Sequence, residues 1–151
     1  MRLLTILCLV LLSVHSYSQE VVTGPFLIID GITYDQNTNE PVTGIVESFH
    51  GNGQLSSRGN FIYGKRDGLW EYFYENGQLL GRGNYIDGGR EGLHETFHEN
   101  GQLEIRGNYI DGEPDGLYEL FYENGQLKRR GNYIDGKRTR TYRNGVPSRS
   151  L

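Results

Sequence analysis

The sequence predicts an all-β protein, an extended single-layer antiparallel β-meander built of 24-residue β-hairpin repeats. The first observation is a fixed period, because one phenylalanine and one glycine recur every 24 residues. Self-similarity at a constant period is typical of a repeat array. The second observation is the glycine content, 22 of 151 residues. Each glycine costs a helix about 1 kcal/mol, so long helices are not expected. The recurring residues are Phe49, Phe73, Phe97 and Phe121, with Gly53, Gly77, Gly101 and Gly125.

Each repeat is predicted to contain two strands, as the copy Leu69–Gly92 shows best. The first strand covers Leu69–Glu75 and is rich in aromatic residues, and the second runs from Gln78 to about Ile86. The Asn-Gly pair between them favours a two-residue type I′ turn. The second strand ends at Asp87-Gly88, and a looser connection over residues 89–92 then leads to the next copy. Structural turns are therefore predicted at Asn52, Gly53, Asn76, Gly77, Asn100, Gly101, Asn124 and Gly125.

Pairing outward from this turn predicts the register of the hairpin. Glu71 falls opposite Arg82, and an opposite-charge pair across a ladder contributes about 0.2–1 kcal/mol. The same count places Trp70 opposite Gly83, where a large ring would shield the bare backbone. The other copies predict the pairs Glu47–Arg58, Glu95–Arg106 and Glu119–Arg130.

The N-terminus has the features of a secretory signal peptide, predicted over residues 1–18. Arg2 provides a positive start, Leu3–Leu12 forms an apolar run, and cleavage is expected near Ser18-Gln19. The run is too short to span a membrane, which takes about 20 residues. The only cysteine, Cys8, would be removed with this segment, so no disulfide is expected in the mature chain. The sequence thus predicts a secreted or periplasmic protein of the bacterial envelope.

The remaining chain divides into three parts. Residues 19–43 are predicted to form capping strands and a loop, with strands at Phe26–Ile29 and Ile32–Tyr34 around an Asp-Gly turn. Such a cap covers the first apolar face and open edge of an array. The array itself is predicted over residues 44–145, its last copy shortened by four residues. Residues 146–151 form a C-terminal tail in which Pro147 cannot extend a ladder.

The strings ENGQL and DGLWE, in tandem and in register, resemble the MORN-repeat variant of bacterial YwqK-like proteins. The resemblance covers Gly44 to about Gly136. It implies an elongated antiparallel sheet with a role in protein–protein contact, and it brings no catalytic residues. Members of this group are often described as antitoxins of toxin–antitoxin pairs. This chain departs from that description, because an antagonist of a cytoplasmic toxin should not carry a secretion signal.

One segment fits a zinc-protease pattern, since residues 94–98 have the form H-E-x-x-H. That pattern binds zinc on a helix, where residues four apart share a face. Here residues 70–74 and 118–122 are the equivalent stretches of other copies, and both are predicted to be strands. Two histidines four apart on a strand are separated by about 13 Å, too far for one zinc ion. No metal site and no enzymatic activity are therefore predicted.

Other ligands are also disfavoured. The recurring aspartates (Asp67, Asp87, Asp111 and Asp135) put one or two carboxylates at each turn, whereas calcium takes 6–8 oxygen ligands. No glycine-rich phosphate loop opens a helix, so no cofactor is predicted. A net charge of −4 without a basic run is unsuited to nucleic acid or anionic lipid.

Strand alternation predicts an aromatic strip on one face of the sheet, and this strip is the candidate binding site. One interpretation is that both faces are structural, because a thin sheet needs aromatic cover. The other is that rigid aromatic side chains form a binding surface. We expect a non-enzymatic repeat scaffold that binds a protein or an envelope polymer; the alternative is an antitoxin or immunity-type protein that neutralises a partner toxin. The strip comprises Trp70, Tyr72, Tyr74, His94, His98, Tyr118 and Tyr122, with Leu79, Leu103 and Leu127 beside them.

Overall fold

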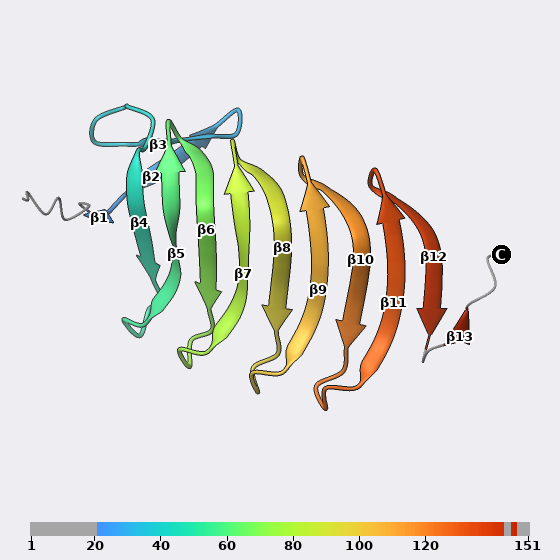
Figure 1. Cartoon of the computed structure of the whole chain (residues 1–151). Coiled ribbons are helices and arrows are strands. Elements are labelled where there is room, and N and C mark those ends of the chain that lie inside the picture. Colours follow the sequence, from blue (N-terminus) through green and yellow to red (C-terminus); the bar gives the residue numbers. More distant parts are fainter. Residues whose placement is uncertain (1–20, 144–145, 148–151) are drawn as a thin grey trace, which may run out of the picture.

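The computed structural model describes residues 21–143 and 146–147, which form one long sheet and a small hairpin (Figure 1). Eleven strands make up the long sheet, in the order β1-β4-β5-β6-β7-β8-β9-β10-β11-β12-β13, and β2 pairs with β3 separately. The predicted signal peptide, residues 1–18, lies outside the described residues. The strands are β1 (Val21–Val22), β2 (Phe26–Ile29), β3 (Ile32–Asp35), β4 (Gly44–Phe49), β5 (Leu55–Ile62), β6 (Lys65–Phe73), β7 (Leu79–Ile86), β8 (Gly89–Phe97), β9 (Leu103–Ile110), β10 (Glu113–Phe121), β11 (Leu127–Ile134), β12 (Lys137–Arg143) and β13 (Val146–Pro147).

The long sheet confirms the predicted meander of hairpin repeats. From β4 to β13 each strand pairs antiparallel with the next strand in the chain. Only β1 departs from this pattern, because it pairs parallel to β4 through Val21↔Ile45 and Val22↔Val46. The short β1 therefore covers part of the first edge of the sheet.

The predicted register is confirmed at the charged residues. Glu71 pairs with Arg82, and Arg58 pairs with Glu71 across the neighbouring strand boundary. The opposite charges therefore form one continuous row across eight strands instead of four separate pairs. In order the row reads Glu47, Arg58, Glu71, Arg82, Glu95, Arg106, Glu119 and Arg130.

The Asn-Gly pairs lie in turns, but the predicted type I′ geometry is wrong. Gly77 N–H donates to Tyr74 O (2.9 Å) and Tyr74 N–H donates to Gln78 O (2.9 Å), which closes a three-residue loop. Gly77 alone has positive φ (83°) in this loop, as expected for a type I turn followed by a left-handed glycine. Asn76 contributes through its side chain, since Gln78 N–H donates to its Oδ1 (2.9 Å).

This longer loop shifts the pairing beside it. Phe73 pairs with Leu79 and not with Leu80, because Leu80 is the extra residue of a bulge. Leu79 therefore lies on the side of Phe73 and Glu71, opposite to Trp70 and Tyr72. The prediction that Leu79, Leu103 and Leu127 accompany the aromatic strip is wrong for this reason.

The two-residue turn occurs at the Asp-Gly pairs. Asp87 and Gly88 both have positive φ, 50° and 85°, and Ile86 pairs with Gly89. These are the requirements of a type I′ turn. The predicted loose connection over residues 89–92 is wrong, because these residues form the start of β8 directly after the tight turn. Equivalent turns lie at Tyr63-Gly64, Asp111-Gly112 and Asp135-Gly136.

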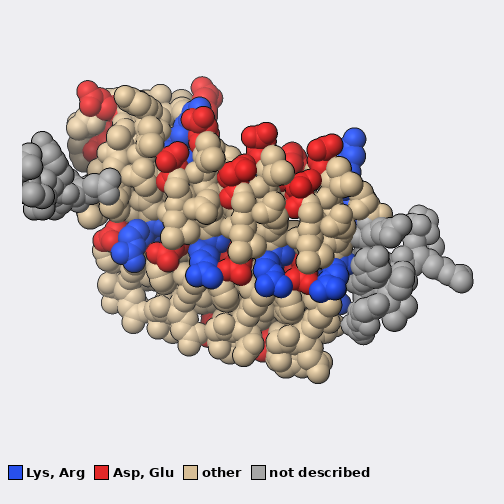
Figure 2. Space-filling model, in the orientation of Figure 1, with Lys and Arg blue, Asp and Glu red and all other residues tan. Residues whose placement is uncertain are grey.

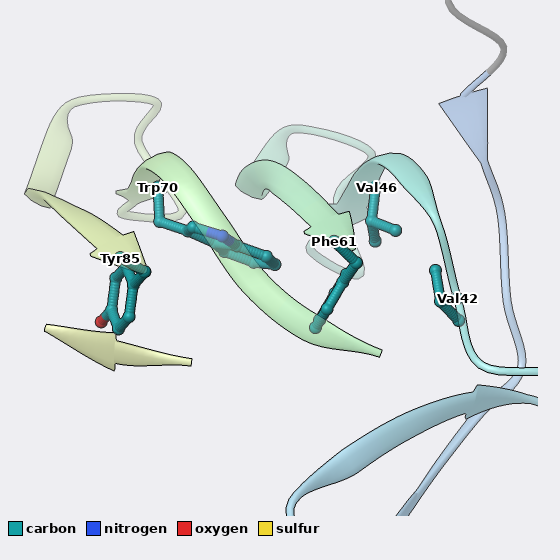
Figure 3. Packing of buried hydrophobic residues seen from close by; sticks show 5 residues of the cluster. All are labelled: Val42, Val46, Phe61, Trp70 and Tyr85. Atoms are coloured by element: carbon teal, nitrogen blue, oxygen red, sulfur yellow. The ribbon is translucent and has the colours of Figure 1, made fainter. Parts of the chain in front are cut away.

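The N-terminal hairpin forms as predicted from Phe26–Ile29 and Ile32–Asp35, and it packs across the first repeat. Thr33 N–H donates to Gly64 O (2.9 Å), and Gly64 N–H donates to Val42 O (2.7 Å). Phe26 packs against a small core that lies at this end of the sheet (Figure 3). The core consists of Val42, Val46, Phe61, Trp70 and Tyr85.

At the other end, the shortened last copy closes the sheet with β12 and β13. Tyr142 pairs with Pro147 and Arg143 with Val146. Proline lacks the N–H that a further strand would need, so the last described strand is a poor template for extension.

Candidate binding surface on the aromatic face

The two sides of the long sheet differ in chemistry. We call the side that carries Trp70, His94 and Tyr118 the aromatic face, and the side that carries the Glu–Arg row the charged face. Figure 2 shows the charged face, on which blue and red residues alternate in a row across the strands. The candidate site lies on the aromatic face.

Large rings on this face lie over glycines, but over different ones than predicted. Trp70 pairs with Gly83 in the ladder, as expected. Its ring, however, leans toward the preceding strand and covers Gly59, where a Cβ would collide with the indole. His94 covers Gly83 in the same way, and Tyr118 covers Gly107. Each ring therefore joins its own repeat to the repeat before it.

Hydrogen bonds fix this lean. Trp70 Nε1–H donates to Asn60 O (3.1 Å), and His94 Nε2–H donates to Asn84 O (2.8 Å), the equivalent carbonyl one repeat later. Trp70 is only 4% exposed and contacts Phe61 edge-on, with ring centroids 5.0 Å apart. Of the predicted site residues, Trp70 thus belongs to the core.

A hollow of about 450 Å³ opens on the aromatic face over β6 to β10. It brings together three predicted site residues, Tyr72, His94 and Tyr118. Its floor includes Gly81, at a repeat position where the other copies have Ser57, Ile105 and Arg129. The hollow exists in part because this one copy lacks a side chain there.

The lining also includes two arginines and two tyrosines that were not among the predicted site residues, namely Arg66, Arg90, Tyr85 and Tyr109. Tyr85 and Tyr109 lie in the second strand of each hairpin, and each arginine is the second residue after a tight turn. The predicted loose connection over residues 89–92 includes Arg90, so the sequence interpretation did not assign this residue to a face of the sheet. The corrected turn type places both arginines in strands on this face.

The two arginines stack on aromatic rings. The Arg66 guanidinium lies 4.8 Å from the centroid of Trp70 and 5.5 Å from that of Tyr85. The Arg90 guanidinium lies 5.2 Å from the centroid of Tyr109, and Arg90 Nη1–H donates to the Tyr109 hydroxyl (3.3 Å). Within the described part of the chain, neither arginine has a carboxylate oxygen within 4 Å. Both guanidiniums therefore bring positive charge to the hollow.

Three titratable groups of the hollow, Tyr72, Tyr118 and His94, are neutral at pH 7. Burial raises the pKa of Tyr72 to about 12 and that of Tyr118 to about 12, so both keep their hydroxyl protons. Burial and the nearby Arg90 lower the pKa of His94, although its hydrogen bond to the Asn84 carbonyl acts in the opposite direction. The hollow therefore combines hydroxyl donors and two cations with apolar walls.

Comparison with known proteins identifies the repeats. The MORN repeat variant family matches residues 42–63, 66–87, 90–111 and 114–135, four segments that together cover more than half of the chain. The chain belongs to the MORN repeat variant family. The match to 66–87 begins just after one tight turn and ends in the next, so each matched MORN segment contains one hairpin such as β6–β7.

No curated protein matches the chain. Among solved structures, a variant of S. aureus TarM in complex with fondaparinux, alpha-GlcNAc-glycerol and UDP is similar, with a TM-score of 0.36 and 18% sequence identity. That match covers 80% of this chain and 21% of the other, so the chain spans about a fifth of the length of that protein.

A second set of predicted site residues links successive MORN repeats. The Tyr74 hydroxyl donates to Phe97 O (2.7 Å), and His98 Nε2–H donates to Phe121 O (3.2 Å). His50 makes the same contact with Phe73 O (2.8 Å) in the first copy. Tyr74 and His98 are therefore occupied in the scaffold and do not line the hollow that holds Tyr72, His94 and Tyr118.

Tyr122 holds the same repeat position near the end of the array. Its side chain is 46% exposed, and the Lys128 ammonium lies 5.3 Å from its ring centroid. It borders a shallower depression together with His98 and Lys128, apart from the main hollow. The residues of the predicted strip thus do not form one site. One belongs to the core, two link successive repeats, three border the hollow, and Tyr122 lies near the end of the array.

The charged face is tightest at Glu119, which is 2% exposed. Arg106 Nη2 and Arg130 Nη2 each lie 2.6 Å from one of its carboxylate oxygens. Burial alone would raise the pKa of Glu119, but the hydrogen bonds from the two arginines lower it overall. Farther along the row, Arg58 is 3.8 Å from Glu47 and 3.7 Å from Glu71, so the MORN repeats differ in how closely this row is paired.

The segment that fits the zinc pattern is a strand, as predicted, with His94 inside β8 and His98 just after it. Within residues 21–143 and 146–147, no group of three or more His, Cys, Asp or Glu side chains could hold a metal ion. The same residues include no helix long and apolar enough to span a membrane.

Proposed function

We propose that this MORN-repeat protein is a non-enzymatic binding module that contacts a partner protein through the hollow on its aromatic face. The observation that carries the proposal is the concentration of Tyr72, His94 and Tyr118 with two arginines around one depression. Tyrosine and arginine are enriched among residues that dominate binding energy at protein interfaces. On the opposite face, by contrast, the glutamates and arginines of the row form ion pairs with one another.

The proposal includes export from the cytoplasm. Residues 1–18 have the charge, apolar run and small residues of a secretory signal, with cleavage expected near Ser18-Gln19. Expression of the full chain with a C-terminal tag should yield an envelope-located product that begins at Gln19. A cytoplasmic product that retains residues 1–18 would contradict this part.

The binding surface is tested by capture of partners from an envelope fraction with the immobilised mature chain. Tyr72→Ala and Tyr118→Ala should each weaken the capture of a specific partner at least tenfold, the effect of about 1.4 kcal/mol. Tyr63→Ala is a matched control, because Tyr63 is 75% exposed and lies in a tight turn away from the hollow. Equal capture by all three variants would refute the role of the hollow.

A second candidate is an antitoxin or immunity-type protein, which would use the same surface to neutralise a toxin. The favouring observation is that the hollow sits on a sheet braced by side-chain bonds between repeats, a rigid surface suited to a tight one-to-one complex. This role requires that the captured partner be toxic on its own. It also requires that co-expression of this chain restore growth, and the Tyr118→Ala variant should restore it less well.

A further inference from the structure

The arginines of the aromatic face differ from those of the charged face in one respect. On the charged face every arginine of the row has a glutamate within 4 Å, and the closest contacts measure 2.6 Å. Arg66 and Arg90 have no such partner among the described residues. Glu95 also borders the hollow, but its carboxylate is paired with Arg82 at 2.8 Å. The hollow therefore has positive charge that the described fold does not neutralise.

Stacking leaves these guanidiniums ready to bind an anion. A guanidinium that lies over an aromatic ring still presents its N–H groups at the edge of its plane. Those N–H groups match the two oxygens of a carboxylate, and such charge-assisted pairs are among the stronger hydrogen bonds. Because Arg66 is held over Trp70 and Arg90 over Tyr109, little side-chain freedom remains to be lost on binding.

The positions of the two arginines suggest the shape of the ligand. Arg66 lies in β6 and Arg90 in β8, with β7 between them, so their backbones are about 9.6 Å apart at the usual strand spacing. Tyr85 of β7 lies between the arginines, since it pairs with Arg90 and its ring contacts Arg66. The depression over Gly81 lies four residues, about 13 Å, farther along β7; it is bordered by Tyr72 and Ile105 and offers space for an apolar side chain. An extended polypeptide covers that distance in about four residues and presents every second side chain to the same face.

We infer that the hollow binds an acidic, extended segment of the partner polypeptide. Its carboxylates pair with Arg66 and Arg90 at one end of the hollow, and an apolar side chain about four residues along, on the same face of the segment, lies over Gly81. This inference rests on the proposed function and adds the chemical class of the ligand. A polyphosphate is the less suitable anion, because it has no apolar group to occupy the depression over Gly81.

The test is calorimetric titration of the mature chain with a random copolymer of glutamate and tyrosine, with inorganic polyphosphate of matched charge as the second probe. Arg66→Gln and Arg90→Gln should each weaken copolymer binding by about tenfold. Arg58→Gln removes the same charge from the opposite face and should leave the affinity unchanged. Arg66→Lys and Arg90→Lys keep the charge without the planar fork and should give intermediate affinities.

Three results would overturn the inference: no binding of the copolymer, an equal loss in Arg58→Gln, or equally tight binding of polyphosphate. If Arg66→Gln fails to fold because it loses its stacking on Trp70, the exposed Arg90 decides the matter through Arg90→Gln. Failure of the copolymer with continued, Tyr72-dependent capture of an envelope partner would refute the acidic ligand alone. Loss of both would refute the proposed function as well.

Discussion

The two faces of the sheet follow different rules from repeat to repeat. On the charged face, each of the four copies has a glutamate and an arginine at the same two positions. On the aromatic face, the position of Trp70 holds Val46, Trp70, His94 or Tyr118, and the position of Gly81 holds Ser57, Gly81, Ile105 or Arg129. Both faces belong to the same strands, so backbone pairing alone does not explain the difference.

What the contrast teaches is a division of roles within one layer. A row of alternating charges can be built from identical units, because each unit presents the same partner to both neighbours. A binding surface built that way would be uniform and could not form one hollow at one place. The irregular copies of the aromatic face provide such a place at Gly81, flanked by Tyr72. Four predictions test this division, from the largest expected effect to the smallest.

Trp70→Ala should reduce the free energy of unfolding by about 3–5 kcal/mol, as for a large aromatic residue removed from a core. Tyr118 holds the same repeat position but is half-buried, so Tyr118→Ala should reduce the free energy of unfolding by roughly half as much. Denaturant unfolding measures both. Equal losses at the two positions would show that the aromatic face is uniformly structural, contrary to the division proposed.

Glu119→Gln should reduce the free energy of unfolding by about 2–3 kcal/mol, because it leaves Arg106 and Arg130 without their shared carboxylate. Glu71→Gln is the matched control in an open part of the same row, where the nearest arginine is 3.7 Å away, and should cost less than about 1 kcal/mol.

The pKa of Glu119 is lowered in the folded state. The stability that its ionised form provides is therefore present above the usual glutamate value of about 4.5 and is lost as the pH falls below it. Glu119→Gln should flatten the acid limb of the stability curve, which denaturant unfolding at a series of pH values measures.

His94→Tyr should remove a pH dependence on the aromatic face. The folded state lowers the pKa of His94, so the unfolded chain binds its proton more readily. Stability should therefore fall as the pH drops through the usual histidine value near 6.5. Tyrosine is the residue at the equivalent position 118, and the variant should melt at nearly the same temperature at about pH 7.5 and about pH 5.5. An unchanged pH dependence in His94→Tyr would contradict the assignment.

Tyr63→Asn should stabilise the protein by about 0.5 kcal/mol. Tyr63 has a φ of 48° in a tight turn where the later copies have aspartate, and asparagine adopts that conformation more readily than tyrosine. Because Tyr63 is 75% exposed, little packing is lost. Thermal unfolding would detect the change, and Tyr63→Phe, which retains the steric cost, should show none.

Periodicity and strand alternation were sufficient to predict the meander, the strand boundaries to within a few residues, and the Glu71–Arg82 register. They worked because one register alone places opposite charges across the ladder in every copy. The turn types could not be predicted in this way. Asn-Gly suits both a type I′ turn and a three-residue loop, and only the second lets the Asn76 side chain accept from Gln78.

The site was predicted less completely than the fold. Strand parity placed Tyr72, His94 and Tyr118 on one face, but it could not show which rings would be covered by neighbouring repeats. Trp70 has a glycine on each side, at 59 and at 83, and the sequence does not indicate the direction in which its ring leans. That choice depends on the hydrogen bond to Asn60 O, which exists only once β5 and β6 have paired.

The strand order has a consequence for how the protein folds. From β5 onward each strand pairs only with its neighbours in the chain, so no pairing step requires the closure of a long loop. Chains with such local contacts fold quickly, and repeat arrays fold by nucleation and propagation. The N-terminal hairpin and the only buried core cluster among the described residues lie together on the first repeats. Folding should therefore start at that end and advance toward β12, while mechanical or thermal fraying should run in the reverse direction.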